Sequence, residues 1–202
     1  MPRIYSIRAP LSLRGRRYQG VRGFVGKPFH PPLTDFPIVC YCLAALFASI
    51  SFLSGSDPRR QRDFFVAATF VMVVGFIVSL GTALTGFWDW WKGIPRDRST
   101  GWLGRSQHTQ AWRTINWHAT VMVTVTVITL IDLLLRIPNF EQGRTSGLWL
   151  ALSVAAGVLV LFGAAYGGTL VFEYGFNVEN VSEVWEETEQ DHVRLPRPGA
   201  SE

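Results

Sequence analysis

Four long apolar segments dominate the order of hydrophobic and polar positions along the chain. They cover about residues 36–55, 64–88, 115–137 and 147–172. Each segment is long enough to cross a hydrocarbon core as a helix, which takes roughly 20 residues. In a chain of 202 residues, four such helices leave almost no other sequence to cover them in water. The pattern therefore predicts an all-α membrane protein, a bundle of four transmembrane helices that run up and down.

Polar sequence flanks this membrane domain on both sides. We expect a basic leader over residues 1–29, the four-helix domain over residues 30–176 and an acidic tail over residues 177–202. The first apolar segment follows a long polar leader, and no small-residue cleavage site precedes more soluble sequence. A cleaved signal peptide is therefore not indicated.

Lysine and arginine are unevenly distributed over the loops, and their distribution indicates how the chain lies in the membrane. Cytoplasmic loops carry an excess of these residues. The leader and the loop after the second helix together hold twelve, which are Arg3, Arg8, Arg14, Arg16, Arg17, Arg22, Lys27, Lys92, Arg96, Arg98, Arg105 and Arg113. The opposite side holds five, which are Arg59, Arg60, Arg62, Arg136 and Arg144. We therefore expect both termini in the cytoplasm and a multi-pass position in the inner (plasma) membrane.

The motifs of soluble enzymes and nucleic-acid-binding proteins do not occur in the chain. The only cysteines are Cys40 and Cys42, and at a spacing of two they point to different sides of a helix. Neither a metal pair nor a disulfide is expected from them. No phosphate-binding loop, nucleophile triad or zinc-ligand spacing is present. We therefore expect no catalytic residue, no metal-ligand cluster and no nucleic-acid partner, and the sequence favours a protein that is not an enzyme.

Polar residues that are unusual near a membrane fall at the segment ends that share the cytoplasmic side. At membrane depth such residues are costly, and they tend to face the interior of a bundle, where they pair or serve a function. The candidates are His30, Asp35, Asp89, Arg113, Asn116, His118 and Glu173. We predict one polar layer at that end, with a contact between His118 and Asp35 or Asp89 as its strongest link.

Several of these residues also have a structural explanation. Thr34 or Asp35 suits the N-cap of the first helix, and His30 is expected in an extended approach because residues before proline avoid helix. His118 lies about one turn inside the third helix, where a hydrogen bond to Asn116 or to an acid would satisfy it. The tryptophans near these ends are typical of the aromatic belt at headgroup level, and they are Trp88, Trp90, Trp91, Trp112 and Trp117.

Two further features of the apolar segments predict packing. Asp132 lies four residues before Arg136, so an intrahelical ion pair accounts for this acid near the outer end of the third helix. In the fourth helix, Gly163 and Gly167 have a spacing of four, which allows close contact with another helix.

Four short motifs stand at the helix ends. They are residues 26–38 (Gly-Lys-Pro-Phe-His-Pro-Pro-Leu-Thr-Asp-Phe-Pro-Ile), 85–90 (Thr-Gly-Phe-Trp-Asp-Trp), 113–118 (Arg-Thr-Ile-Asn-Trp-His) and 167–175 (Gly-Gly-Thr-Leu-Val-Phe-Glu-Tyr-Gly). Together they resemble the bacterial membrane family catalogued as domain of unknown function 2231, over about residues 26–180. The Leu-Thr-Asp form is similar to the variety that occurs fused to Rieske iron–sulfur domains, and this resemblance implies a redox neighbourhood. Many members have a histidine where Asp35 stands and another near Tyr174, and this chain departs from them at both places.

These observations support two functions. The first is a non-catalytic integral membrane subunit or anchor that associates with a larger electron-transfer complex, in contact with lipid and with other subunits. The second is a membrane redox carrier that binds haem or quinone through His118 together with His30 or Asp35. His108 is the other histidine that the sequence places near such a site.

The lysine and arginine distribution predicts the result of a topology experiment. A reporter fused after Glu202 should be active only in the cytoplasm, because the basic loops and the tail are expected on that side. The measurement is a pair of fusions, one to a reporter that works only in the cytoplasm and one to a reporter that works only in the periplasm. Activity of the periplasmic reporter would overturn the orientation.

Overall fold

Four long α-helices make up nearly all of the membrane domain. The computed structural model describes residue 21, residues 28–93 and residues 110–176. The helices are α1 (His30–Leu53), α2 (Pro58–Gly93), α3 (Gln110–Arg136) and α4 (Gly147–Phe172), and a short 3₁₀ helix, η1 (Ile137–Gln142), follows α3. All four α-helices are long and apolar enough to cross a membrane.

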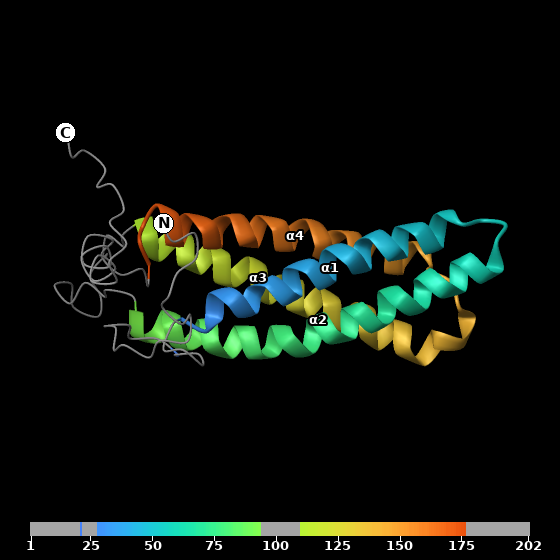
Figure 1. Ribbon diagram of the computed structural model, residues 1–202, viewed down its shortest axis with the longest axis horizontal. Coiled ribbons are helices and arrows are strands. Elements are labelled where there is room, and N and C mark those ends of the chain that lie inside the picture. The colour runs from blue at the N-terminus through green and yellow to red at the C-terminus, as the bar shows by residue number, and fades with distance from the viewer. Residues whose placement is uncertain (1–20, 22–27, 94–109, 177–202) are drawn as a thin grey trace, which may run out of the picture.

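The helices form an up-and-down bundle. Consecutive helices run in opposite directions, so that α1 begins and α4 ends at the same end of the bundle (Figure 1). We call this end, where α2 also ends and α3 begins, the histidine end, and the end with the α1–α2 and α3–α4 connections the loop end. The predicted all-α class and four-helix architecture are confirmed.

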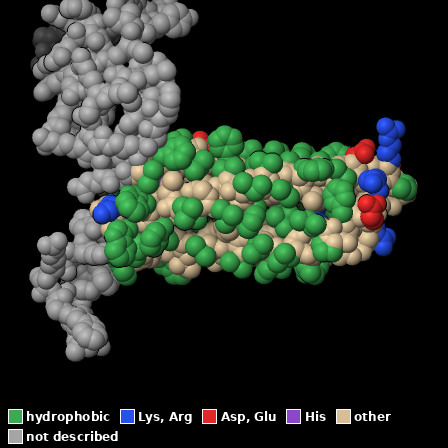
Figure 2. Space-filling view, turned by 90° about the horizontal axis from the view of Figure 1, so that it is seen from below, with side chains coloured by type: hydrophobic (Ala, Val, Ile, Leu, Met, Phe, Trp, Pro, Cys, Tyr) green, Lys and Arg blue, Asp and Glu red, His purple; other side chains and the backbone are tan. Residues whose placement is uncertain are grey.

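The surface of the bundle is largely apolar. Large hydrophobic side chains are exposed along every helix, with Ile77 at 62%, Leu84 at 73% and Leu161 at 55% of their full accessible area. Apolar side chains cover the length of the visible face, while acidic and basic side chains gather mainly at the loop end (Figure 2). An exposed apolar surface of this extent is what contact with lipid tails requires.

The start of α1 differs from the sequence-based expectation. His30 is the first helical residue and Phe29 is the N-cap, so the N-cap expected at Thr34 or Asp35 and the extended approach expected for His30 are wrong. The two prolines that follow His30 occupy the first turn, where backbone N–H groups have no helical partner and a proline therefore loses no hydrogen bond. The helix therefore begins at His30 and continues through both prolines. Asp35 lies inside α1 on an exposed face.

The proline inside α1 is accommodated by α2. Pro37 has no N–H, so the carbonyl of Leu33 lacks its usual partner one turn later. The hydroxyl of Thr82 on α2 lies 3.5 Å from that carbonyl oxygen, and it also lies 3.0 Å from the carbonyl of Val78. Further along the same interface, Tyr41 is buried and donates a hydrogen bond of 3.0 Å to the hydroxyl of Ser79.

Glycines allow the helices to approach closely. A Cβ atom on Gly75 of α2 would lie 2.7 Å from the Cβ of Cys40, closer than packed carbon atoms ever lie. On α4, a Cβ on Gly163 would lie within 3.4 Å of Val121, and one on Gly167 would lie 3.2 Å from the ring of His118. The prediction that these two glycines of α4 face another helix is confirmed, and that helix is α3.

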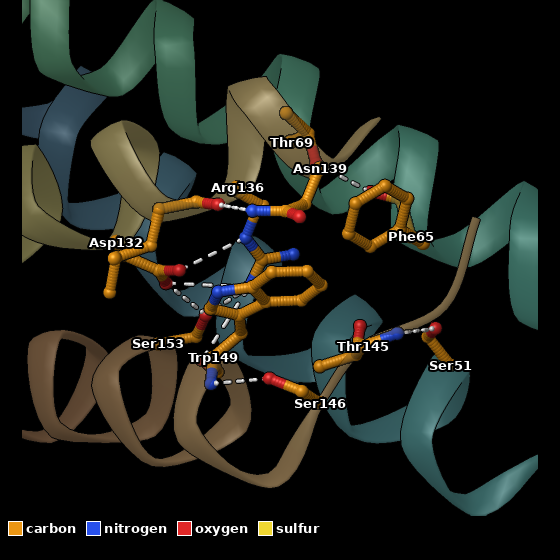
Figure 3. A network of polar contacts seen from close by, with 11 residues as sticks. Ser51, Phe65, Thr69, Asp132, Arg136, Asn139, Thr145, Ser146, Trp149 and Ser153 are labelled. Carbon is orange, nitrogen blue, oxygen red and sulfur yellow. Dashed lines mark hydrogen bonds and ion pairs between the residues drawn. The ribbon is translucent and has the colours of Figure 1, made fainter. Parts of the chain in front are cut away.

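A buried polar network joins three helices near the loop end (Figure 3). Arg136 and Asp132 are both completely buried, and the Nε atom of Arg136 donates to Asp132 at 3.0 Å. Ser153 of α4 donates to the same carboxylate at 2.7 Å and accepts from the Nη2 atom of Arg136 at 2.9 Å. The guanidinium carbon lies 5.4 Å from the ring of Phe65 and 5.7 Å from that of Trp149. The predicted intrahelical ion pair is confirmed, and it also fixes α3 against α2 and α4.

This network predicts a large asymmetry between two ion pairs of the same spacing. Arg136→Ala leaves the Asp132 carboxylate buried without its counter-ion and should lower the free energy of unfolding by about 3–5 kcal/mol. Arg59 and Asp63 form a pair with the same i, i+4 spacing near the same end, but their side chains are 93% and 67% exposed. Arg59→Ala should therefore cause no measurable change. Both variants are compared by denaturant unfolding in detergent micelles, and equal effects would show that burial does not control the contribution of Arg136.

Candidate functional site

His30 lies at the start of α1 and contacts α2. Its Nδ1 atom lies 3.0 Å from the carbonyl oxygen of Thr82 and 3.3 Å from the hydroxyl oxygen of Thr85. The ring reaches this position only because residue 86 is glycine. A Cβ atom on Gly86 would lie 2.6 Å from the Cε1 atom of His30. The imidazole is therefore held by a hydrogen bond to a main-chain carbonyl, and it fits there because residue 86 has no side chain.

His118 has the same arrangement in the other half of the bundle. It lies on α3, and its Nδ1 atom is 2.8 Å from the carbonyl oxygen of Gly163 on α4. Gly167 makes room for its ring, since a Cβ there would lie 3.2 Å from the Cε1 atom. In both hairpins, α1–α2 and α3–α4, the histidine bonds to a carbonyl and the glycine stands four residues after that carbonyl. The same local arrangement of histidine, carbonyl and glycine therefore occurs in both hairpins.

The two imidazoles lie close together inside the bundle. Their ring centroids are 6.3 Å apart and their planes are nearly perpendicular, at 87°. Both residues are partly buried. The structure therefore brings together the two histidines named above as candidate ligands. They lie on α1 and α3 and are 88 residues apart in the chain.

The hydrogen bonds determine where the protons lie on the neutral rings. A carbonyl oxygen only accepts, so the Nδ1 atom of each histidine carries the proton and donates it. The Nε2 atom of each neutral ring then carries a lone pair. Among the described residues, neither Nε2 atom has a hydrogen-bond partner. The pair therefore offers two imidazole lone pairs to a metal, a proton or a hydrogen-bond donor.

Two further predicted residues lie at the same end. Asp89 on α2 is buried and accepts a hydrogen bond of 3.0 Å from the backbone N–H of Val21. Asn116 on α3 accepts a hydrogen bond of 3.1 Å from the Nε1 atom of Trp90. This second bond ties α2 to α3 beside the histidine pair.

Three of the candidate residues do not join this group. Asp35, Arg113 and Glu173 are all exposed. The expected hydrogen bond from His118 to an acid is also wrong, because the Nδ1 atom of His118 bonds to the main chain of α4 instead. Asp35 lies on an exposed face inside α1, which begins at residue 30 and not at about residue 36 as expected.

Sequence reasoning missed the residues that hold the two rings. They are Thr82, Thr85 and Gly86 on α2 and the carbonyl group of Gly163 on α4. A main-chain carbonyl leaves no signal in the sequence. The glycines are visible in the sequence. Gly86 lies three residues before Asp89, and Gly167 lies four residues after Gly163.

The tryptophans around this end have the partial exposure expected of an aromatic belt. Trp88, Trp91 and Trp117 are about half exposed, at 47%, 51% and 60%. The Nζ atom of Lys92 lies 5.4 Å from the ring of Trp88. Amphipathic rings at this position are typical of residues at the level of the lipid headgroups.

Comparison with known proteins gives one match. A family model described as "Predicted membrane protein (DUF2231)" matches residues 26–180, which is most of the chain. No curated protein and no solved structure matches significantly.

The hydrogen bonds predict the protonation of both rings. In ¹⁵N-histidine NMR spectra of the protein in detergent, His30 and His118 should appear in the Nδ1–H form when neutral, because a carbonyl accepts from each Nδ1 atom. Signals are assigned with His30→Gln and His118→Gln. Gly86→Ala should shift the His30 signal, whereas Gly81→Ala on the same helix should not, since a Cβ there meets only Leu33 at 3.8 Å. An Nε2–H form for both rings would contradict the arrangement described here.

Proposed function

We propose that this chain, which belongs to the DUF2231 family of predicted membrane proteins, is a non-catalytic membrane subunit that holds a redox group within a larger electron-transfer complex. The observation that carries this proposal is the close pair of His30 and His118, with both Nδ1 atoms bonded to carbonyls and neither Nε2 atom bonded to a described residue. The subunit takes an electron from one redox centre of the complex and passes it to another.

The cost of polar groups near a membrane supports a role for this pair. An imidazole that served only to join helices would gain most by using both ring nitrogens, since an unpartnered polar atom in an apolar surrounding costs free energy. Each of these rings uses one nitrogen and keeps the other open to a ligand. The open Nε2 lone pairs are therefore available to a ligand.

The rest of the surface supports the role of a subunit. The bundle presents apolar side chains to lipid along its length. By the lysine and arginine distribution, the histidine end lies on the cytoplasmic side of a bacterial inner membrane.

Haem and quinone are the two redox groups to be distinguished. An imidazole nitrogen can ligate haem iron, and it can also accept a hydrogen bond from a reduced quinone. The protein is purified in mild detergent from the membranes of its own host. Its reduced-minus-oxidised absorption spectrum is recorded, and a solvent extract is analysed for quinone.

We expect either haem absorption bands or a stoichiometric quinone. Either signal should be lost in His118→Gln and retained in Asp35→Asn, because Asp35 is exposed and lies outside the pair. A colourless, quinone-free protein that co-purifies with other membrane proteins would show that the chain is an anchor without a redox group.

A further inference from the structure

The spacing of the two imidazoles is that of two ligands of one metal ion. Metal–imidazole bonds are about 2.0–2.1 Å long and a ring centre lies about 1.1 Å behind its nitrogen, so two rings that share a metal in a straight line have centres roughly 6.3 Å apart. The centroids of His30 and His118 are 6.3 Å apart. The angle of 87° between the planes is no obstacle, because each ring can rotate about its own metal–nitrogen bond without changing the spacing.

The contacts behind each ring are also those of a metal ligand. A histidine that binds a metal through one nitrogen commonly donates the other N–H to a carboxylate, a main-chain carbonyl or water, which fixes the tautomer and the orientation of the ring. His30 and His118 each donate from Nδ1 to a main-chain carbonyl, at 3.0 Å and 2.8 Å. The two hairpins therefore each present one prepared ligand atom, Nε2.

The number of protein ligands decides which metal group fits. A structural zinc ion takes four protein ligands and a catalytic zinc ion takes three. The described residues provide no such group of three or more. Haem iron needs at most two protein ligands, one on each side, because the porphyrin supplies the other four.

A quinone suits the pair less well than a metal does. An oxidised quinone has two carbonyl oxygens, which accept hydrogen bonds and donate none. The Nδ1–H donors of both histidines are already bonded to the main chain, and Nε2 of a neutral ring is itself an acceptor. The oxidised form would therefore find no donor on these two rings.

We propose that His30 and His118 are the two axial ligands of one haem iron, bound through their Nε2 atoms. This inference rests on the proposed function, in which the pair holds a redox group, and it names that group. The haem supplies a one-electron Fe(III)/Fe(II) couple. The residues of the chain hold the two imidazoles in place: Thr82 and Gly163 fix the rings through their carbonyls, while Gly86 and Gly167 leave space for them.

The test is a titration of the full-length protein in detergent with haemin. We expect one haemin per chain and the Soret and visible bands of low-spin, six-coordinate iron, as two imidazole ligands require. His30→Gln and His118→Gln should each remove the low-spin bands. His192→Gln, a control at the histidine of the acidic tail, should leave them unchanged. Circular dichroism and thermal melting show whether each variant is folded.

A second pair of variants covers the case in which the glutamine variants do not fold. His30→Met and His118→Met retain a ligand atom of a different kind, and methionine raises the reduction potential of a haem. If both histidines are ligands, each variant should remain low-spin with a raised midpoint potential. A role in packing alone would leave the potential unchanged.

Three outcomes would overturn the haem assignment. They are failure of the wild-type chain to bind haemin, haemin binding that does not depend on both His30 and His118, and binding of Cu²⁺ or Zn²⁺ ions in place of haemin. If the host-purified protein carries quinone and the chain does not bind haemin, the haem assignment is wrong and the proposed redox function stands. If the host-purified protein carries neither group and haemin does not bind, both are wrong.

Discussion

Hydrocarbon offers no hydrogen bonds, and this constraint decides where the polar side chains of the bundle lie. Each polar group at membrane depth must find its partner within the protein or carry the cost of having none. At the loop end Asp132, Arg136 and Ser153 bond to one another, and among the described residues only the Nη1 atom of Arg136 is left without a partner in this network. At the histidine end His30 and His118 each bond to a main-chain carbonyl through one nitrogen, and the other nitrogen has no hydrogen-bond partner among the described residues. The loop end thus holds the helices together, and the histidine end has the features of a binding site.

Glycines are as important as polar groups in positioning the two rings. Gly86 and Gly167 each stand four residues after the carbonyl that accepts from a histidine, so a single turn of helix provides both the acceptor and the space. The repetition of this unit in the two hairpins makes the pair nearly symmetric. Two imidazoles with the same kind of support and centroids 6.3 Å apart suit a ligand with two equivalent faces, such as a haem iron.

The fold could be predicted from the sequence because lipid contact imposes long apolar helices, which hydropathy reveals directly. The site could be predicted in part. His30, Asp89, Asn116 and His118 were found because polar residues at membrane depth are unusual. Asp35 was misplaced because the helix was expected to begin after it, whereas α1 begins at His30 and continues through the two prolines of its first turn. The carbonyl partners could not be predicted, because every residue has a carbonyl and only the packing of α3 on α4 selects that of Gly163.

Native mass spectrometry of the protein extracted from its own membranes tests the cofactor site most directly. The mass of the ion released from detergent is compared with that of the bare chain, for the wild type and for His118→Gln. The account predicts an excess equal to one haem on the wild type and none on the variant. A wild-type ion with the mass of the bare chain, under conditions that preserve bound lipid, would contradict it.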